Sequence, residues 1–401
     1  MSGRGEPPFR FGEVVAGDYF TDREAEARAL VDDVQHGLNT VLISPRRLGK
    51  TSLMLRVIDQ LRRAGTLVAY VDLLRAPSKE RLAAQLAAAI YAGLESPFDR
   101  ARERAVTLFG HLRVRPKPTL NPDGSLSFEF GVGLADDEAD ADATLEQLLT
   151  MPGTIARQRS ARVALVLDEF QEVVDLDPHV PALMRSIFQR QAEVSHLFLG
   201  SRQHLLRRVF TDRGQPLYRL ARPMLLGPIP PAVFVPFLRE RFAAGRSQIT
   251  TEAATRLVDI TGGHPNDTQE LGHFAWALAM AEGRPATPEV VERALDAVVQ
   301  VEHARCSELW ETLTPHQRLV LLAVALDEGQ GLYRERTRRQ HRLGPAARIQ
   351  KSVRRLVDRE LVEPVPAGGY RVPDVFLRAW LRRLGQDPAA AAARPTGAGP
   401  S

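Results

Sequence analysis

One stretch decides the fold: residues 41–52, which read Val41-Leu42-Ile43-Ser44-Pro45-Arg46-Arg47-Leu48-Gly49-Lys50-Thr51-Ser52. The apolar start predicts a buried strand that breaks into a turn, and a helix is expected to follow the turn. Gly49, Lys50 and Thr51 match the phosphate-binding pattern G-x-x-x-x-G-K-[ST], and Ser44 stands where the first glycine is expected. The stretch is therefore interpreted as a phosphate-binding loop.

Each residue type in this loop has a chemical role toward a nucleotide. Gly49 lets the backbone approach a phosphate, and amides at the start of the next helix point at the anion. Lys50 is expected to reach the β- and γ-phosphates, and the Thr51 hydroxyl is expected to bind Mg2+. The predicted ATP-binding residues are Ser44, Pro45, Arg46, Arg47, Leu48, Gly49, Lys50, Thr51 and Ser52. On this motif alone, an accidental strand-turn-helix remains the alternative.

A second motif follows at residues 161–172, which read ARVALVLDEFQE. Five apolar residues in a row predict a buried parallel strand, and two carboxylates end it. Asp168 is expected to hold Mg2+, and Glu169 is expected to orient or deprotonate the attacking water. A solvated strand end is the alternative, although the two motifs in this order favour nucleotide binding.

Three stretches together resemble the archaeal-type ATPase family, a branch of the AAA+/STAND P-loop ATPases. These are residues 45–53, residues 167–171 and residues 261–265 (TGGHP), and the likeness spans residues 20–384. The resemblance implies that Ser201, at the end of a later strand, senses the γ-phosphate. It also implies that Pro265 lies against the adenine, so that a helical lid reports the nucleotide state. A plain helix-helix turn is the alternative at Pro265.

Composition limits the class of protein. A chain of 401 residues with 44% hydrophobic content is long enough for two to three domains. Its single cysteine, Cys306, excludes a disulfide framework. No run of about 18 apolar residues and no secretory segment is found, so we expect a cytoplasmic protein without a membrane anchor.

The chain order predicts an α/β fold of the P-loop type, because strands that alternate with helices form a parallel sheet. The expected parts are an extended arm (1–19), an ATPase domain (20–228) with an inserted hairpin at about 101–146, a helical lid and connector (229–312), a winged helix-turn-helix domain (313–385) and a disordered tail (386–401). Thr21 is predicted to cap the first helix, with Glu24 as its capping-box partner.

A basic helix marks the last domain. Between residues 344 and 360, Ile349 and Val353 share one face at helical spacing. The opposite face carries Arg348, Lys351 and Arg355. A short two-stranded wing around Gly368 is expected to follow. A basic helix beside a wing favours phosphate contacts with duplex DNA, and docking of a protein partner is the alternative.

Together these features predict an ATP-driven switch: a slow or partner-stimulated ATPase whose nucleotide state repositions the winged helix. The expected ligands are ATP or ADP with Mg2+, and a nucleotide-dependent oligomer is a further expectation. The competing hypothesis is an adaptor that binds nucleotide with little turnover and docks a protein partner. A metabolic P-loop kinase is disfavoured, because it needs an acceptor site in place of a winged domain.

Overall fold

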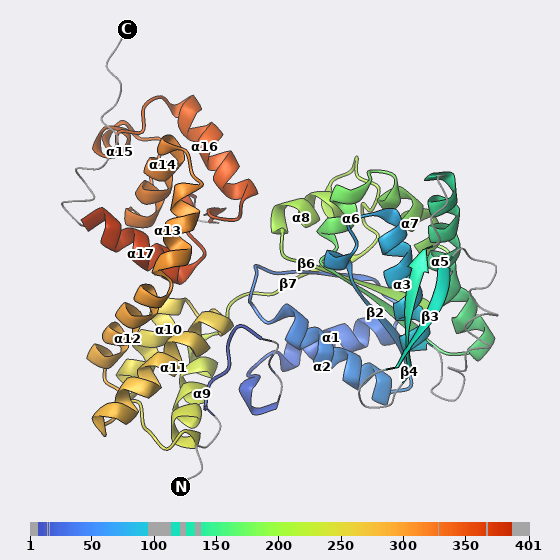
Figure 1. The fold of residues 1–401 in the computed structure, drawn as a ribbon, viewed down its shortest axis with the longest axis horizontal. Helices are drawn as coiled ribbons and strands as arrows, with labels where there is room; N and C mark the ends of the chain where they lie inside the picture. Colours follow the sequence, from blue (N-terminus) through green and yellow to red (C-terminus); the bar gives the residue numbers. More distant parts are fainter. Residues whose placement is uncertain are drawn as a thin grey trace. The chain divides into compact units, whose positions relative to one another are not determined.

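The computed structural model describes residues 7–13, 15, 17–94, 114–120, 126–132, 138–327, 329–365 and 368–386 (Figure 1). Two compact units make up the chain. The first unit is Val14–Pro228, and the second joins Met1–Glu13 to Ile229–Ser401. The expected ATPase domain therefore corresponds to the first unit, while the lid and the winged helix share the second.

A five-stranded parallel sheet forms the first unit, in the order β2-β5-β6-β1-β7. Its strands are β1 (Thr40–Ile43), β2 (Leu67–Asp72), β5 (Val163–Asp168), β6 (Val194–Gly200) and β7 (Arg222–Leu225). Every residue of β1, β5 and β6 is buried, as a parallel sheet with two covered faces requires. Because β6 lies between β1 and β5, polar residues that follow these three strands meet at one edge.

Helices cover both faces of this sheet (Figure 1). One face packs on α1 (Glu24–Gln35) and α2 (Lys50–Arg63) through Leu42 of β1 and its neighbours. Val41 and Ile43 point to the other face, as alternate residues of a strand do. That face is covered by α3 (Lys79–Leu94), α5 (Glu138–Arg159), α6 (Gln171–Leu176), α7 (Val180–Phe188) and α8 (Gln203–Thr211). The predicted three-layer α/β fold is confirmed.

The inserted segment contains a hairpin. Strands β3 (Val114–Leu120) and β4 (Leu126–Val132) pair antiparallel, with Val114 opposite Val132. The turn that the sequence predicts between them lies outside the described residues.

The start of α1 differs from the prediction. The helix begins at Glu24, and Arg23 precedes it with a left-handed φ of 77°, without a side-chain cap. Thr21 is therefore not the N-cap. The side chain of Arg23 is buried instead, and it donates to the Gly227 carbonyl and to Glu26. The contact with Gly227, which is distant in sequence, holds the backbone in a conformation that local capping rules do not predict.

Four helices form the lid: α9 (Pro231–Ala244), α10 (Thr251–Thr261), α11 (Pro265–Glu282) and α12 (Pro288–Val301). Residues 7–13 pack on them. Phe9 is 2% exposed, and its ring meets Phe242 edge-on at 5.5 Å. The amide of Gly12 also donates to Asn266. This part of the expected arm therefore belongs to the lid core.

The winged helix domain consists of α13 (His303–Glu311), α14 (Pro315–Leu326), α15 (Glu335–Gln340), α16 (Ala346–Asp358), β8 (Glu363–Pro364), β9 (Tyr370–Arg371) and α17 (Val375–Gln386). Its strands pair antiparallel, so the predicted wing is confirmed. Thr314 and Gln317 form a capping box at the start of α14. Within the described chain, no helix is long and apolar enough to cross a membrane.

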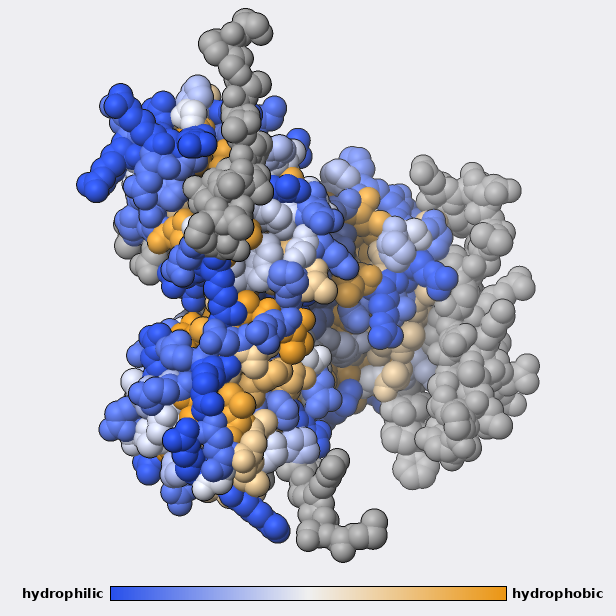
Figure 2. Space-filling model, turned by 60° about the vertical axis from the view of Figure 1, so that its left-hand side comes forward, coloured by the Kyte–Doolittle hydropathy of each residue, from blue (hydrophilic) through white to orange (hydrophobic). Residues whose placement is uncertain are grey.

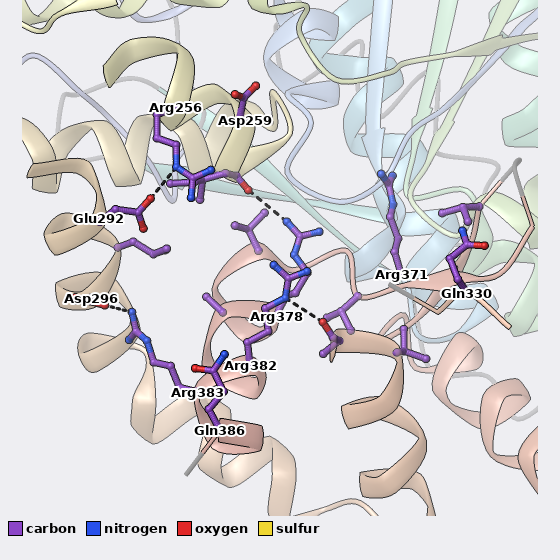
Figure 3. A pocket seen from close by; sticks show the side chains of 18 residues that line it. Arg256, Asp259, Glu292, Asp296, Gln330, Arg371, Arg378, Arg382, Arg383 and Gln386 are labelled. Atoms are coloured by element: carbon purple, nitrogen blue, oxygen red, sulfur yellow. Dashed lines mark hydrogen bonds and ion pairs between the residues drawn. The ribbon is translucent and has the colours of Figure 1, made fainter. Parts of the chain in front are cut away.

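The lid and the winged helix are joined through α17. Val375 and Phe376 of this helix are buried in the lid core, and Arg383 forms an ion pair with Asp296 of α12. Beside this contact lies a groove of about 670 Å3. Figure 3 shows that it is lined by arginine side chains from α10 and α17, several of them bonded to lid carboxylates or backbone oxygens. These contacts make the lid and the winged helix one packed unit.

Candidate functional site

The loop expected to bind phosphate joins β1 to α2. Gly49 precedes the helix with a φ of 80°, and Arg47 also has a left-handed φ of 62°. Gly49 is suited to this conformation because it has no Cβ. Ser44 is buried, and its hydroxyl donates to the Pro45 carbonyl over 2.9 Å. Ser44 does not have a positive φ. The position of the first motif glycine therefore does not require glycine in this chain.

Lys50 lies at the centre of the site. Its side chain is 7% exposed, and its Nζ lies 3.0 Å from Glu169 Oε1 and 3.9 Å from Asp168 Oδ1. A buried ammonium needs such counter-charges, because burial removes its hydration. The structure thus brings together the lysine of the loop and both carboxylates of the second motif, which are separated by more than 100 residues of sequence.

Asp168 ends β5 and accepts three hydrogen bonds. The Thr51 hydroxyl lies 3.4 Å from its Oδ2, and the Glu169 amide lies 2.9 Å from its Oδ1. The third donor is the Tyr70 hydroxyl, at 2.6 Å from Oδ2. Burial and the neighbouring Asp168 raise the pKa of Tyr70, so this hydroxyl keeps its proton and donates. The oxygens of Thr51 and Asp168 are hard ligands of the kind that Mg2+ prefers.

Tyr70 was not predicted from the sequence. It lies on β2, which pairs with β5 in parallel, and Asp72 is the residue opposite Asp168 in that register. The Asp72 side chain accepts a hydrogen bond from the Leu74 amide. A tyrosine two positions before the end of a buried strand was the only signal in the sequence.

Glu169 follows Asp168 with a left-handed φ of 53°. Gln171 Nε2 and the Ser201 hydroxyl both donate to its Oε2, the latter over 3.3 Å. Burial opposes ionisation of Glu169, but the charge of Lys50 and these hydrogen bonds outweigh it and lower the pKa of the carboxyl. Glu169 is therefore a carboxylate at neutral pH. Gln171 is a second residue that the sequence reasoning missed.

Ser201 reaches the site because β6 lies between β1 and β5. It directly follows this strand, and its hydroxyl contacts Glu169. Its predicted role as a sensor of the γ-phosphate stays a prediction. The next residue, Arg202, forms an ion pair with Asp175 on α6.

Pro265 belongs to the second unit. It begins α11 directly after His264, and the preceding Gly262 and Gly263 have φ values of 61° and 71°. The Ile229 amide donates to the Gly263 carbonyl over 2.9 Å, which ties this turn to the start of the lid. The contact of Pro265 with an adenine stays a prediction.

The basic helix is α16. Ile349 and Val353 are buried in the winged helix core, as predicted, and Leu356 is buried with them. Its exposed face carries Arg348, Lys351 and Arg355. In Figure 2 the winged helix lies at the upper left, and the surface seen there is mostly hydrophilic. The face is thus accessible and positively charged, while its binding to DNA stays a prediction.

Comparison with known proteins agrees with this geometry. Residues 20–271 match a family described as an ATPase domain predominantly from Archaea, and residues 305–383 match a "probable winged helix domain". The chain therefore belongs to this archaeal ATPase family, as the sequence motifs predicted. No curated protein matches the chain.

Solved structures share the fold at low sequence identity. A Walker-type ATPase of Pyrococcus abyssi is similar with a TM-score of 0.61 and 18% identity, over 90% of this chain and 96% of that one. The ORC2 protein of Aeropyrum pernix, solved in ADPNP-ADP complexes, is similar with a TM-score of 0.54 and 17% identity, over 96% and 98% of the two chains. At this level of identity, these likenesses show a shared fold.

Proposed function

We propose that the protein binds ATP with Mg2+ at this site and hydrolyses it. The cluster of Lys50, Thr51, Asp168 and Glu169 carries the proposal, because it combines the cation, the two oxygen ligands and the base that phosphoryl transfer requires. The ADPNP-ADP complexes of the similar ORC2 protein support binding of adenine nucleotides.

In this proposal, each residue of the chain has a defined task. Backbone amides of the loop and the Lys50 ammonium hold the phosphates. Thr51 and Asp168 would hold Mg2+, and the ion would supply positive charge beside the transferred phosphoryl group. Glu169, kept ionised by its neighbours, orients a water molecule or accepts its proton. Ser201, which already contacts Glu169, is suited to sense the γ-phosphate.

The nucleotide state would be transmitted to the second unit. The chain passes between the units at residues 13–14 and again at residues 228–229. Pro265, at the start of α11, is proposed to contact the adenine. Because α17 is packed into the lid core, movement of the lid would carry the winged helix with it. Hydrolysis would thus release a switch that the bound nucleotide holds in place.

The exposed basic face of α16 supports duplex DNA as the partner, through contacts of Arg348, Lys351 and Arg355 with phosphates. A cytoplasmic ATPase that is slow alone and stimulated by its partner fits this arrangement, as does assembly into a nucleotide-dependent oligomer. An adaptor that docks a protein through the same face is the second candidate.

One experiment separates the two candidates. The rate of ATP hydrolysis is measured with and without duplex DNA, together with the mass in solution in ATP and in ADP. Turnover that DNA stimulates supports the switch. Nucleotide that stays bound without turnover, with no response to DNA, contradicts the switch and supports the adaptor.

A further inference from the structure

Gln171, the glutamine of the second motif, contacts Glu169 but has no role in the proposed function. We infer that Gln171 is a positioning residue. Its side-chain amide holds one oxygen of Glu169 in place, so that the other oxygen is presented to water when the phosphates of ATP bind Lys50. The inference rests on the proposed function and names a further requirement of the same site.

The two oxygens of Glu169 have different partners. Oε1 faces the Lys50 ammonium at 3.0 Å, while Oε2 accepts from Gln171 and from Ser201. In the bound state, the phosphates compete for the charge of Lys50. Oε1 then loses its strongest partner, whereas the Gln171 anchor on Oε2 does not depend on the nucleotide. The anchored carboxylate keeps its orientation, and Oε1 becomes the oxygen that can act on water.

The backbone around Gln171 is fixed. The Phe170 amide donates to the Leu199 carbonyl of β6 over 2.8 Å, and the Phe170 ring is fully buried against Phe198 at 4.8 Å. Gln171 begins α6 directly afterwards, and its side chain is 2% exposed. The sharp turn at Glu169 brings the side-chain amide of Gln171 back to the Glu169 carboxylate. A rigid support of this kind is what orientation of a reacting group needs.

The amide can face Glu169 in one way only. Its NH2 group must point at the carboxylate, because the reverse orientation would place two acceptor oxygens together. Gln171 Oε1 is consequently buried without a hydrogen-bond partner among the described residues. It faces Gly200, where an added Cβ would lie only 2.3 Å away. A buried acceptor without a hydrogen-bond partner lowers the stability of the fold. The orientation that lets Gln171 donate to Glu169 therefore has a cost in stability.

This cost provides the test. Gln171→Met keeps the size of the side chain but removes both the donor to Glu169 and the unpartnered oxygen. We expect the melting temperature to stay the same or rise, while kcat falls roughly 10- to 10²-fold, the scale of a misplaced catalytic group. The Kd for a non-hydrolysable ATP analogue, measured by calorimetry, should change less than about threefold, because Gln171 does not face the phosphates.

Gln191→Met is the matched control. This second buried glutamine donates to the Leu149 carbonyl over 2.9 Å, away from the site. We expect the control variant to lower the melting temperature. Its kcat, measured at temperatures below that melting temperature, should be unchanged. A Gln171→Met variant that keeps the wild-type kcat, or whose kcat and melting temperature fall together as for a destabilised fold, overturns the inference.

Glu169→Gln is measured in parallel. If turnover is lost in Glu169→Gln but kept in Gln171→Met, the inference about Gln171 is wrong and the proposed function still stands. Turnover that survives in Glu169→Gln overturns the proposed function, and the inference with it.

Discussion

Two charged regions of the molecule are built in opposite ways. Around Lys50, three charges from two sequence motifs are largely buried, with the ammonium within 4 Å of both carboxylates, and strand order fixes their positions. On α16, Arg348, Lys351 and Arg355 share the exposed face of a single helix. Buried charges are weakly screened and depend on exact partners, whereas exposed charges are screened by salt and act collectively. One region is suited to chemistry on a small ligand, and the other to contact with an extended polyanion.

The largest effect is expected from Lys50→Ala. The variant removes the cation that lies within 4 Å of both Asp168 and Glu169, and the phosphates lose their positive partner. We expect no measurable binding of Mg-ATP by calorimetry. Lys79→Ala is the matched control, because Lys79 pairs with Asp142 and Asp177 instead. Undiminished affinity in Lys50→Ala would show that the loop does not bind the nucleotide.

Glu169→Gln is expected to separate binding from chemistry. The amide keeps the shape of the side chain but cannot accept a proton, so turnover should fall at least about 10²-fold while Mg-ATP still binds. Steady-state hydrolysis and calorimetry measure the two effects. Glu193→Gln, on an exposed residue elsewhere in the same unit, should leave both unchanged. Normal turnover in Glu169→Gln would remove its catalytic role.

The basic face of α16 should respond to salt in a way that the buried cluster does not. If three side chains each neutralise a phosphate, replacing Arg348, Lys351 and Arg355 with alanine should flatten the log-log salt dependence of duplex affinity by roughly 2 to 3 units. The helix should stay folded, because its buried face is intact. Ile349→Asp, by contrast, should unfold the domain. A folded wild-type protein whose duplex affinity does not depend on salt would favour protein docking.

A smaller effect is expected from Tyr70→Phe, which removes one hydrogen bond to Asp168. Residues that support a metal ligand tune metal affinity, so the Mg2+ concentration for half-maximal turnover should rise by about 10-fold. Binding of ATP without Mg2+ should not change, because Tyr70 does not belong to the loop. An unchanged Mg2+ requirement would show that Thr51 and the Glu169 amide are sufficient to orient Asp168.

Much of the site could be predicted because its signals are local. Gly49, Lys50 and Thr51 are adjacent in sequence, and the five apolar residues before Asp168 predict a buried strand on their own. The amphipathic spacing of Ile349 and Val353 likewise predicts which face of α16 is buried. Each of these patterns depends on spacing within one or two turns of chain, which the sequence shows directly.

Only the tertiary structure decided which distant residues meet. Tyr70 is 98 residues from Asp168 in the sequence and reaches it because β2 pairs with β5. Gln171 belongs to the second motif, but only the turn after β5 brings its side chain to Glu169. The helix cap expected at Thr21 was wrong for the same reason, since the buried contact of Arg23 with Gly227 overrides it. The packing of residues 7–13 on the lid is equally nonlocal. Such contacts depend on the free energy of the whole fold, and that free energy cannot be derived from the spacing of neighbouring residues.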